Sequence, residues 1–202
     1  MSSHHTIREN QEPAVCLLDA KAISIHILQD VLEWSPLLIC SASCLPWVLS
    51  HDLKVDAVIA PKEKHEALLA LLAHQQPVSL IEEKSSCLKS GLSYIQSTQN
   101  PSCYIFSNWD SLPSLSDDTQ LYTSKITWIN GQCQGFLLNE RTYHKWYAAG
   151  TQIEIKPMSP VYTLWIDEEK QLPKSVFNIT MEENKMLNLK VEGRMFLVES
   201  LQ

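Results

Sequence analysis

Glycine is scarce in this sequence, and its scarcity limits the phosphate-binding sites that the chain can build. Only five glycines occur among 202 residues, and the first of them is Gly91. This share is about a third of the usual ~7%. Loops that bind phosphate need glycine, because a Cβ atom would keep phosphate oxygens away from the backbone N–H groups. The first 90 residues therefore contain neither a P-loop nor a dinucleotide-binding fingerprint.

Three further features are absent. The chain has no basic cluster and a formal net charge of −7, whereas binding to nucleic acid depends on cations that neutralise phosphate. No apolar run reaches the ~18 residues of a membrane helix. The N-terminus also lacks the charged-then-apolar order of a signal peptide. We therefore expect a cytoplasmic protein that binds neither nucleic acid nor a membrane.

The cysteines give no sign of a metal site. Six of them are scattered along the chain, several inside apolar runs: Cys16, Cys40, Cys44, Cys87, Cys103 and Cys133. The closest spacing is Cys40-x3-Cys44, and a structural zinc site needs a second pair, or histidines at suitable spacing, that the sequence lacks. We interpret the cysteines as reduced core residues and assign no metal ligand.

The first half of the chain alternates short apolar runs with segments of helical spacing. Residues 1–12 are polar and are expected to form a disordered tail. Strand-length apolar runs follow at residues 14–18, 37–40, 57–60, 78–81 and 103–106, and helical patterns lie at 21–34, 61–73 and 86–97. Apolar strands that alternate with helices are typical of a parallel sheet covered on both faces. The pattern predicts a three-layer α/β domain with a mostly parallel sheet over residues 13–120.

Beyond the Ser-, Asp- and Pro-rich stretch at residues 108–119, apolar residues recur at every second position. Apolar and polar residues alternate at 152–156, 177–181 and 187–191, and strands at 126–130 and 133–138 flank the turn sequence Asn130-Gly131-Gln132. Such alternation favours half-buried strands. Residues 121–202 are therefore expected to form an antiparallel β-sandwich.

Aromatic residues gather in the second half of the chain and allow two interpretations. Tyr143, Trp146 and Tyr147, with Trp128 and Trp165, could stack against a flat ligand. Aromatic side chains of a β domain more often fill a core or a subunit interface, so the second interpretation is favoured.

The order of these pieces resembles bacterial thiamin pyrophosphokinases. The resemblance rests on residues 35–60, on 87–106, and on the closing strands at 150–156, 177–180 and 192–198. It implies a nucleotide-binding α/β domain, followed by a β-sandwich that helps to form the thiamin site in a homodimer. It also implies transfer of pyrophosphate from ATP to thiamin, with Mg²⁺ as cofactor.

The sequence departs from the family at the residues that carry this chemistry. Ser41-Ala42-Ser43 stands where the family has Asp-Gly-Gly, and residues 60–64 stand where it has Gly-Asp-x-Asp-Ser, so that Glu63 alone keeps a carboxylate. Residues 86–89 keep only Lys89 of Asp-x-Thr-Lys, and residues 107–110 lack the glycine and histidine of Gly-Arg-x-Asp-His. Mg²⁺ is held by carboxylates together with phosphate oxygens, so most of the charge that would hold it is missing.

Three hypotheses follow from the retained pattern and the missing acids. The favoured one is a catalytically degenerate thiamin pyrophosphokinase-like protein that keeps a thiamin or nucleotide ligand or a partner, with no catalytic residue assigned. The second is an active thiamin pyrophosphokinase that uses ATP and Mg²⁺ and finds its metal ligands among Glu63, Glu82, Glu83, Asp110, Asp117 and Asp118. The third is an interaction module without a small-molecule site. In open α/β sheets, ligands bind at the carboxyl ends of the strands. This rule predicts a crevice formed by Ser41, Ser43, Glu63, Ser86, Lys89, Asn108 and Asp110.

Overall fold

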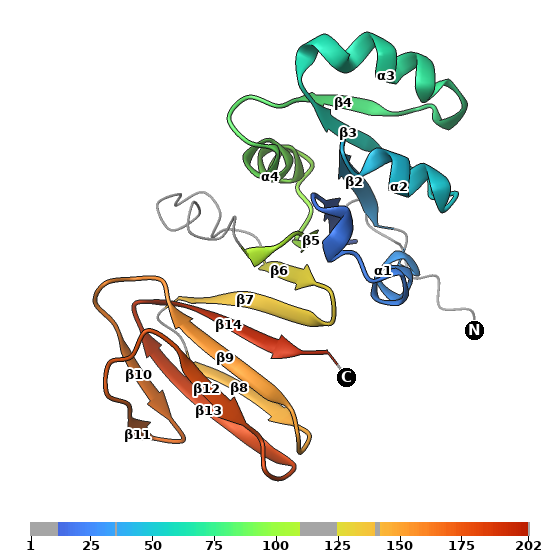
Figure 1. Ribbon diagram of the computed structural model, residues 1–202. Helices are drawn as coiled ribbons and strands as arrows, with labels where there is room; N and C mark the ends of the chain where they lie inside the picture. Colours follow the sequence, from blue (N-terminus) through green and yellow to red (C-terminus); the bar gives the residue numbers. More distant parts are fainter. Residues whose placement is uncertain (1–11, 35, 110–124, 140–141, 202) are drawn as a thin grey trace, which may run out of the picture. The chain divides into compact units, whose positions relative to one another are not determined.

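The structure is a computed structural model that describes residues 12–34, 36–109, 125–139 and 142–201. Two compact units can be distinguished, and each is described by itself (Figure 1). The first contains the described residues up to Asn108 and residues 125–131, and the second contains Trp109 and the described residues from Gln132 onward. None of the helices in these ranges combines the length and the apolar character that crossing a bilayer requires.

The first unit is an α/β domain. Its strands are β1 (Ala14–Leu17), β2 (Leu37–Ser41), β3 (Ala57–Ala60), β4 (Ser79–Glu82), β5 (Ser102–Phe106) and β6 (Lys125–Asn130). Its α-helices are α1 (Ile25–Leu32), α2 (Leu45–Ser50), α3 (His65–Leu71) and α4 (Cys87–Ser97). Short 3-10 turns are η1 (Ala20–Ala22), η2 (Lys62–Lys64) and η3 (Ala73–Gln75).

The sheet of this unit is parallel, in the order β6-β5-β1-β2-β3-β4. Side chains on one face of the strands, such as Val15 of β1, pack with Leu28 of α1 and Val48 of α2 in one buried cluster. The other face meets α4, where Gly91 lies so close to Cys16 and Ile59 that an added Cβ would stand 3.1 and 3.0 Å from their side chains. Helices therefore cover both faces, as Figure 1 shows, and the predicted three-layer α/β architecture is confirmed.

Strand β6 lies in a different unit from the one that the sequence predicts. The alternation of the sequence groups it with the β domain, whereas the structure pairs it in parallel with β5, so that Ile105 lies opposite Trp128. Alternation shows which side chains of a strand share a face, but it does not show which strand will lie beside it. Residues 125–131 are consequently part of the first unit.

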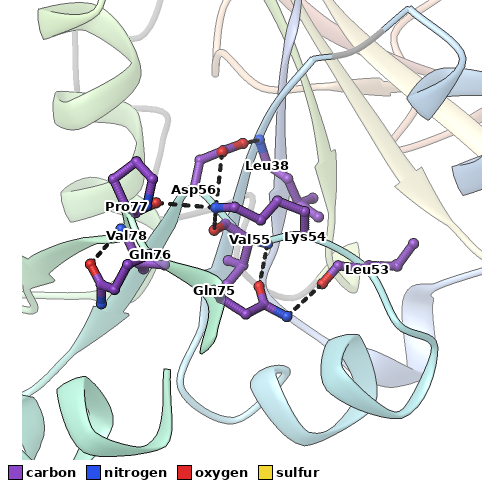
Figure 2. A network of polar contacts seen from close by, with 9 residues as sticks. All are labelled: Leu38, Leu53, Lys54, Val55, Asp56, Gln75, Gln76, Pro77 and Val78. Atoms are coloured by element: carbon purple, nitrogen blue, oxygen red, sulfur yellow. Dashed lines mark hydrogen bonds and ion pairs between the residues drawn. The ribbon is translucent and has the colours of Figure 1, made fainter. Parts of the chain in front are cut away.

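At the amino-terminal edge of this sheet, side chains join the segments that lead into β3 and β4 (Figure 2). The amide of Gln75 accepts a hydrogen bond from the backbone N–H of Val55 (2.8 Å) and donates one to the carbonyl of Leu53 (3.2 Å). The Lys54 ammonium donates to the carbonyls of Val55 and Pro77. These contacts satisfy backbone groups of irregular chain, so this edge is held by structural hydrogen bonds.

The second unit is a sandwich of two antiparallel sheets. One has the order β12-β9-β14-β7 and the other the order β11-β10-β13-β8. The strands are β7 (Cys133–Asn139), β8 (Thr142–Tyr147), β9 (Gln152–Pro157), β10 (Thr163–Ile166), β11 (Glu169–Lys170), β12 (Phe177–Thr180), β13 (Lys185–Glu192) and β14 (Arg194–Ser200). Ile155 and Leu197 of the first sheet and Leu187 and Leu189 of the second lie in one buried cluster. The expected antiparallel β-sandwich is confirmed.

A buried carboxylate joins the two sheets of the sandwich. Glu199 of β14 is 2% exposed and accepts hydrogen bonds from the Tyr147 hydroxyl, the Lys145 ammonium and the Gln134 amide. Since the Tyr147 hydroxyl donates to Glu199, the Tyr143 hydroxyl 2.9 Å away is the donor between the two tyrosines. Burial raises the pKa of Tyr143 to about 12, and burial together with the Glu199 contact raises the pKa of Tyr147 further.

Candidate functional site

The carboxyl ends of the parallel strands form the edge at which the sequence predicts a crevice. The chain passes from β1 through β2 and β3 to β4 in one direction and then returns to β5 on the other side of β1. The order of the sheet therefore reverses between β1 and β5. Open α/β sheets bind ligands at such a switch point, outside the carboxyl ends of the strands.

The predicted crevice residues that the structure describes all follow strands at this edge. Ser41 ends β2, Ser43 lies in the turn before α2, Glu63 lies in η2 after β3, Ser86 and Lys89 lie at the start of α4, and Asn108 follows β5. Asp110, Asp117 and Asp118 lie outside the described residues. The carboxyl ends of parallel strands lie at one common edge of the sheet. The residues that follow these strands therefore lie at that edge.

Two pairs of these residues are in contact. The hydroxyls of Ser41 and Ser43 lie 2.8 Å apart, and Ser41 Oγ also accepts from the backbone N–H of Cys44 (3.2 Å). Ser86 caps α4 by accepting from the backbone N–H of Lys89 (3.2 Å). Glu63 is exposed and forms no hydrogen bond to either pair within the part of the chain that the structure describes.

The hydroxyl of Ser41 is directed into the protein. Ser41 is 4% exposed, and its Oγ donates to the carbonyl of Leu18, directly after β1, at 3.4 Å. Together with its bonds to Ser43 and Cys44, this contact commits the hydroxyl to the turn that joins β2 to α2. The turn thus presents neutral, internally bonded groups beside β1, where a carboxylate would present a charge.

Asp19 is an acidic residue at the switch point, just after β1, that the sequence pattern did not identify. Its carboxylate accepts from the backbone N–H of Lys21 (2.9 Å) and caps η1. The backbone N–H groups of Leu18 and Asp19 donate to the carbonyl of Phe106 at 2.9 and 3.2 Å, which ties the end of β1 to the end of β5. The strand-end rule, applied to the first apolar run at residues 14–18, would have identified this residue.

A groove of about 530 Å³ extends along α4, from Lys89 near its start to Ser97 at its end. Its lining includes Glu82, Lys84, Lys89 and Ser90. Lys84 and Lys89 give it positive charge next to the N-terminal end of the helix, where backbone N–H groups favour anions. Lys89, which matches the lysine of the family's Asp-x-Thr-Lys, therefore lies in a hollow of the surface and not in the sheet core.

The donor set at this edge does not fit a divalent cation. Across the described ranges, no group of three or more His, Cys, Asp or Glu side chains is placed to hold a metal ion. Cys40 and Cys44 are buried free thiols, and burial raises the pKa of both. A metal requires the thiolate form, so their environment favours the structural role expected from the sequence.

The aromatic residues of the second half do not form one cluster. Side chains alternate across a strand, so Tyr143 and Tyr147 of β8 face the sandwich interior while Trp146 is 61% exposed. Trp128 is fully buried in the first unit. Trp165 lines a hollow on the outer face of the second sheet.

Comparisons with known proteins place the fold. No family model matches the sequence, and no curated protein matches it. Solved structures do match: thiamine pyrophosphokinase from Bacillus subtilis has a TM-score of 0.68 and 12% identity, over 94% of this chain and 99% of that one. This chain has the thiamin pyrophosphokinase fold.

Eukaryotic thiamin pyrophosphokinases share the same arrangement. The enzyme from Candida albicans matches with a TM-score of 0.65 and 10% identity, over 94% of this chain and 90% of that one. Yeast thiamin pyrophosphokinase matches with a TM-score of 0.63 and 9% identity, over 97% and 88%. The resemblance expected from the sequence is therefore confirmed for the fold, over both units.

Proposed function

We propose that this chain is a ligand-binding protein of thiamin pyrophosphokinase fold that does not transfer pyrophosphate. The ligand class is thiamin, a thiamin phosphate or a nucleotide, taken from what the structurally similar enzymes act on. Its place is the carboxyl edge of the parallel sheet, beside the switch point between β1 and β5. A homodimer and a cytoplasmic location belong to the same proposal.

The observation that carries this proposal is the turn after β2. Pyrophosphate transfer from ATP depends on Mg²⁺ that bridges phosphate oxygens and is held by carboxylates. The turn offers Ser41 and Ser43, whose hydroxyls bond to each other and, at Ser41, to the backbone. Loss of one group that stabilises charge in a transition state removes about 2.7–4 kcal/mol. Several such losses together leave little turnover.

An active enzyme remains the second candidate, and one observation favours it. Asp19 supplies a carboxylate at the end of β1, tied through its backbone to the end of β5. Glu82 and Glu83, at the end of β4, lie three strands away from β1 and, among the described residues, form no group with Asp19 that could hold a metal ion. An active enzyme would therefore need metal ligands other than Glu82 and Glu83 beside Asp19. The interaction module without a ligand is the third candidate.

The experiment measures thiamin-dependent formation of AMP from ATP and Mg²⁺, and in parallel the thermal midpoint of the full chain with thiamin, thiamin diphosphate or ATP. We expect no AMP and a rise in midpoint with one ligand, because a ligand that binds only the folded state stabilises it. AMP formation that Asp19→Asn abolishes would establish the active enzyme. No shift with any of the ligands would favour the interaction module.

Variants locate the ligand. Lys89→Ala and Glu63→Gln should each reduce the ligand-dependent rise, because both side chains are exposed at the carboxyl edge. Lys174→Ala and Glu182→Gln, exposed residues of the second unit, are the matched controls and should leave the rise unchanged. If Lys89→Ala and Glu63→Gln both behave like the controls, the ligand binds elsewhere.

A further inference from the structure

A groove of about 660 Å³ lies on the outer face of the β11-β10-β13-β8 sheet, and we call it the outer groove. Its polar lining includes Thr142, His144, Asp167, Glu168, Asn188 and Lys190. Because side chains alternate along a strand, Leu187 and Leu189 of β13 enter the core while Met186, on the other face, is 44% exposed. All the described residues that line the groove belong to the second unit.

Two carboxylates stand at one end of the outer groove, on a strained turn. Asp167 and Glu168 join β10 to β11 with φ angles of 47° and 72°. This left-handed conformation favours glycine and is unfavourable for glutamate. Strained residues tend to gather at functional sites. The strain here holds two acidic side chains side by side where glycine or asparagine would make an easier turn.

Asp167 is fixed in its ionised form by neighbours on β13. Its Oδ1 accepts from the backbone N–H of Asn188 (3.0 Å) and from the Asn188 amide (3.3 Å), and its Oδ2 lies 3.5 Å from the Lys185 ammonium. Partial burial would raise the pKa of Asp167, but these contacts outweigh it and hold the pKa below its usual value. The acid end of the groove thus carries negative charge.

The same hydrogen bonds determine the tautomer of His144. Since the Asn188 amide nitrogen donates to Asp167, its Oδ1 faces His144 Nδ1 at 2.7 Å. An amide oxygen only accepts, so Nδ1 carries the proton. In the neutral ring Nε2 then keeps its lone pair. The contacts from Asp167 through Asn188 to His144 thus leave His144 Nε2 as a hydrogen-bond acceptor in the groove, in addition to the two carboxylates.

The other end of the outer groove is aromatic and carries a cation. The Lys190 ammonium lies 4.7 Å from the centre of the Trp165 ring, and that of Lys170 lies 5.9 Å from it. Ring faces of tryptophan attract cations, and the chain's own lysines take this position. A cationic ligand is therefore repelled from this end and attracted to the acid end. The thioether of Met186 offers an apolar contact next to the acid end, on the side of Asn188 away from Lys190 and opposite Trp146 of β8.

We propose that the outer groove binds a small primary ammonium ion with an aromatic or apolar body. The ammonium donates hydrogen bonds to the Glu168 carboxylate and to His144 Nε2, close to the charge of Asp167. The body of the ligand lies against Met186. Hydrogen-bond acceptors and negative charge lie at one end of the groove, with apolar surface beside them. An ammonium ion on an apolar body complements these groups, whereas the carboxylates repel an anion and a neutral alcohol lacks the charge that they attract.

The test is a titration of the full chain followed by the NMR signals of the tryptophan indole N–H groups, with the signal of Trp146, which lies opposite Met186, assigned by Trp146→Phe. The probe is 2-phenylethylammonium, and its neutral and anionic counterparts are 2-phenylethanol and phenylacetate. We expect a saturable shift of the Trp146 signal with the ammonium alone. An equal shift with the alcohol, or no saturable shift with the ammonium, would overturn the proposal.

Two variants should change the affinity in opposite directions. Glu168→Gly removes a carboxylate and relieves the backbone, so it should weaken binding about two- to fivefold without destabilising the unit. Lys190→Gln removes a competing cation and should strengthen binding by a similar factor. Asp52→Asn, at another left-handed acid (φ 54°) in the first unit, is the control and should change nothing. If Lys190→Gln weakens binding, or Glu168→Gly leaves it unchanged, the assigned orientation is wrong.

Discussion

Replacement of Tyr147 by phenylalanine tests the buried network of the sandwich. The Tyr147 hydroxyl donates to Glu199, a carboxylate that is 2% exposed. A hydrogen bond to a charged group contributes about 1.5–3 kcal/mol. Tyr147→Phe also leaves the Tyr143 hydroxyl without the acceptor that it has at 2.9 Å. At neutral pH we therefore expect the free energy of unfolding of the second unit to fall by about 1.5–3 kcal/mol.

The effect should shrink in alkaline solution. The pKa of Tyr147 in the folded state is raised by burial and by the contact with Glu199. Above pH ~10 the tyrosine of the unfolded chain loses its proton while that of the folded chain keeps it. The unfolded state then binds fewer protons, so the stabilisation present below pH ~10 is lost as pH rises, by about 1.4 kcal/mol per pH unit. The difference between wild type and Tyr147→Phe should be about 1.4 kcal/mol smaller at pH ~11 than at pH 7.

Urea unfolding at a series of pH values, followed by near-ultraviolet circular dichroism, measures both quantities. Tyr104→Phe, in β5 of the first unit, is a matched control for the general effect of removing a tyrosine hydroxyl. Equal unfolding free energies of wild type and Tyr147→Phe at pH 7 would refute the assigned hydrogen bond. A difference that stays constant up to pH ~11 would refute the raised pKa of Tyr147.

Two further predictions concern local packing and backbone contacts, and both are measured as changes in the urea midpoint. Gln75→Ala removes both side-chain hydrogen bonds to the segment before β3 and should cost about 1–3 kcal/mol, whereas Gln76→Ala, which loses one exposed bond, should cost clearly less. Gly135→Ala would place a Cβ 2.4 Å from the buried ring of Phe196 and should cost about 1–3 kcal/mol. Equal losses of stability for Gln75→Ala and Gln76→Ala would contradict the hydrogen bonds assigned to Gln75. An unchanged stability of Gly135→Ala would contradict the close packing of Gly135 against Phe196.

The buried parallel strands could be predicted closely from the sequence. The apolar runs at 57–60 and 103–106 correspond to β3 and β5, and the helical pattern at 86–97 corresponds to α4. Fully buried strands leave a continuous apolar run, and α4 begins at a Ser86 cap whose side chain satisfies a free backbone N–H. Such signals are local, so one sequence is sufficient to find them.

The candidate site could be predicted only in part. The rule that ligands bind at strand ends selected Ser41 and Lys89, and the structure places both at that edge. Asp19 was missed, although the strand-end rule applies to it, because a single acid after an apolar run belongs to no motif. The outer groove was missed because Trp165 and Asp167, in β10 and the turn after it, meet Asn188 of β13 and His144 of β8 only when these strands pair.

The sequence by itself determined the apolar strands β1 to β5, that an α/β part precedes a β part, and that glycine-lined phosphate loops are excluded from the first 90 residues. The periodicity of apolar residues and the local composition encode these features within short segments of the chain. Only the tertiary structure decided that β6 joins the parallel sheet, that Glu199 is buried against Tyr147 of the other sheet of the sandwich, and that Asn188 connects Asp167 to His144. Each of these depends on which strand lies beside which, and long-range pairing is set by the packing of the whole unit.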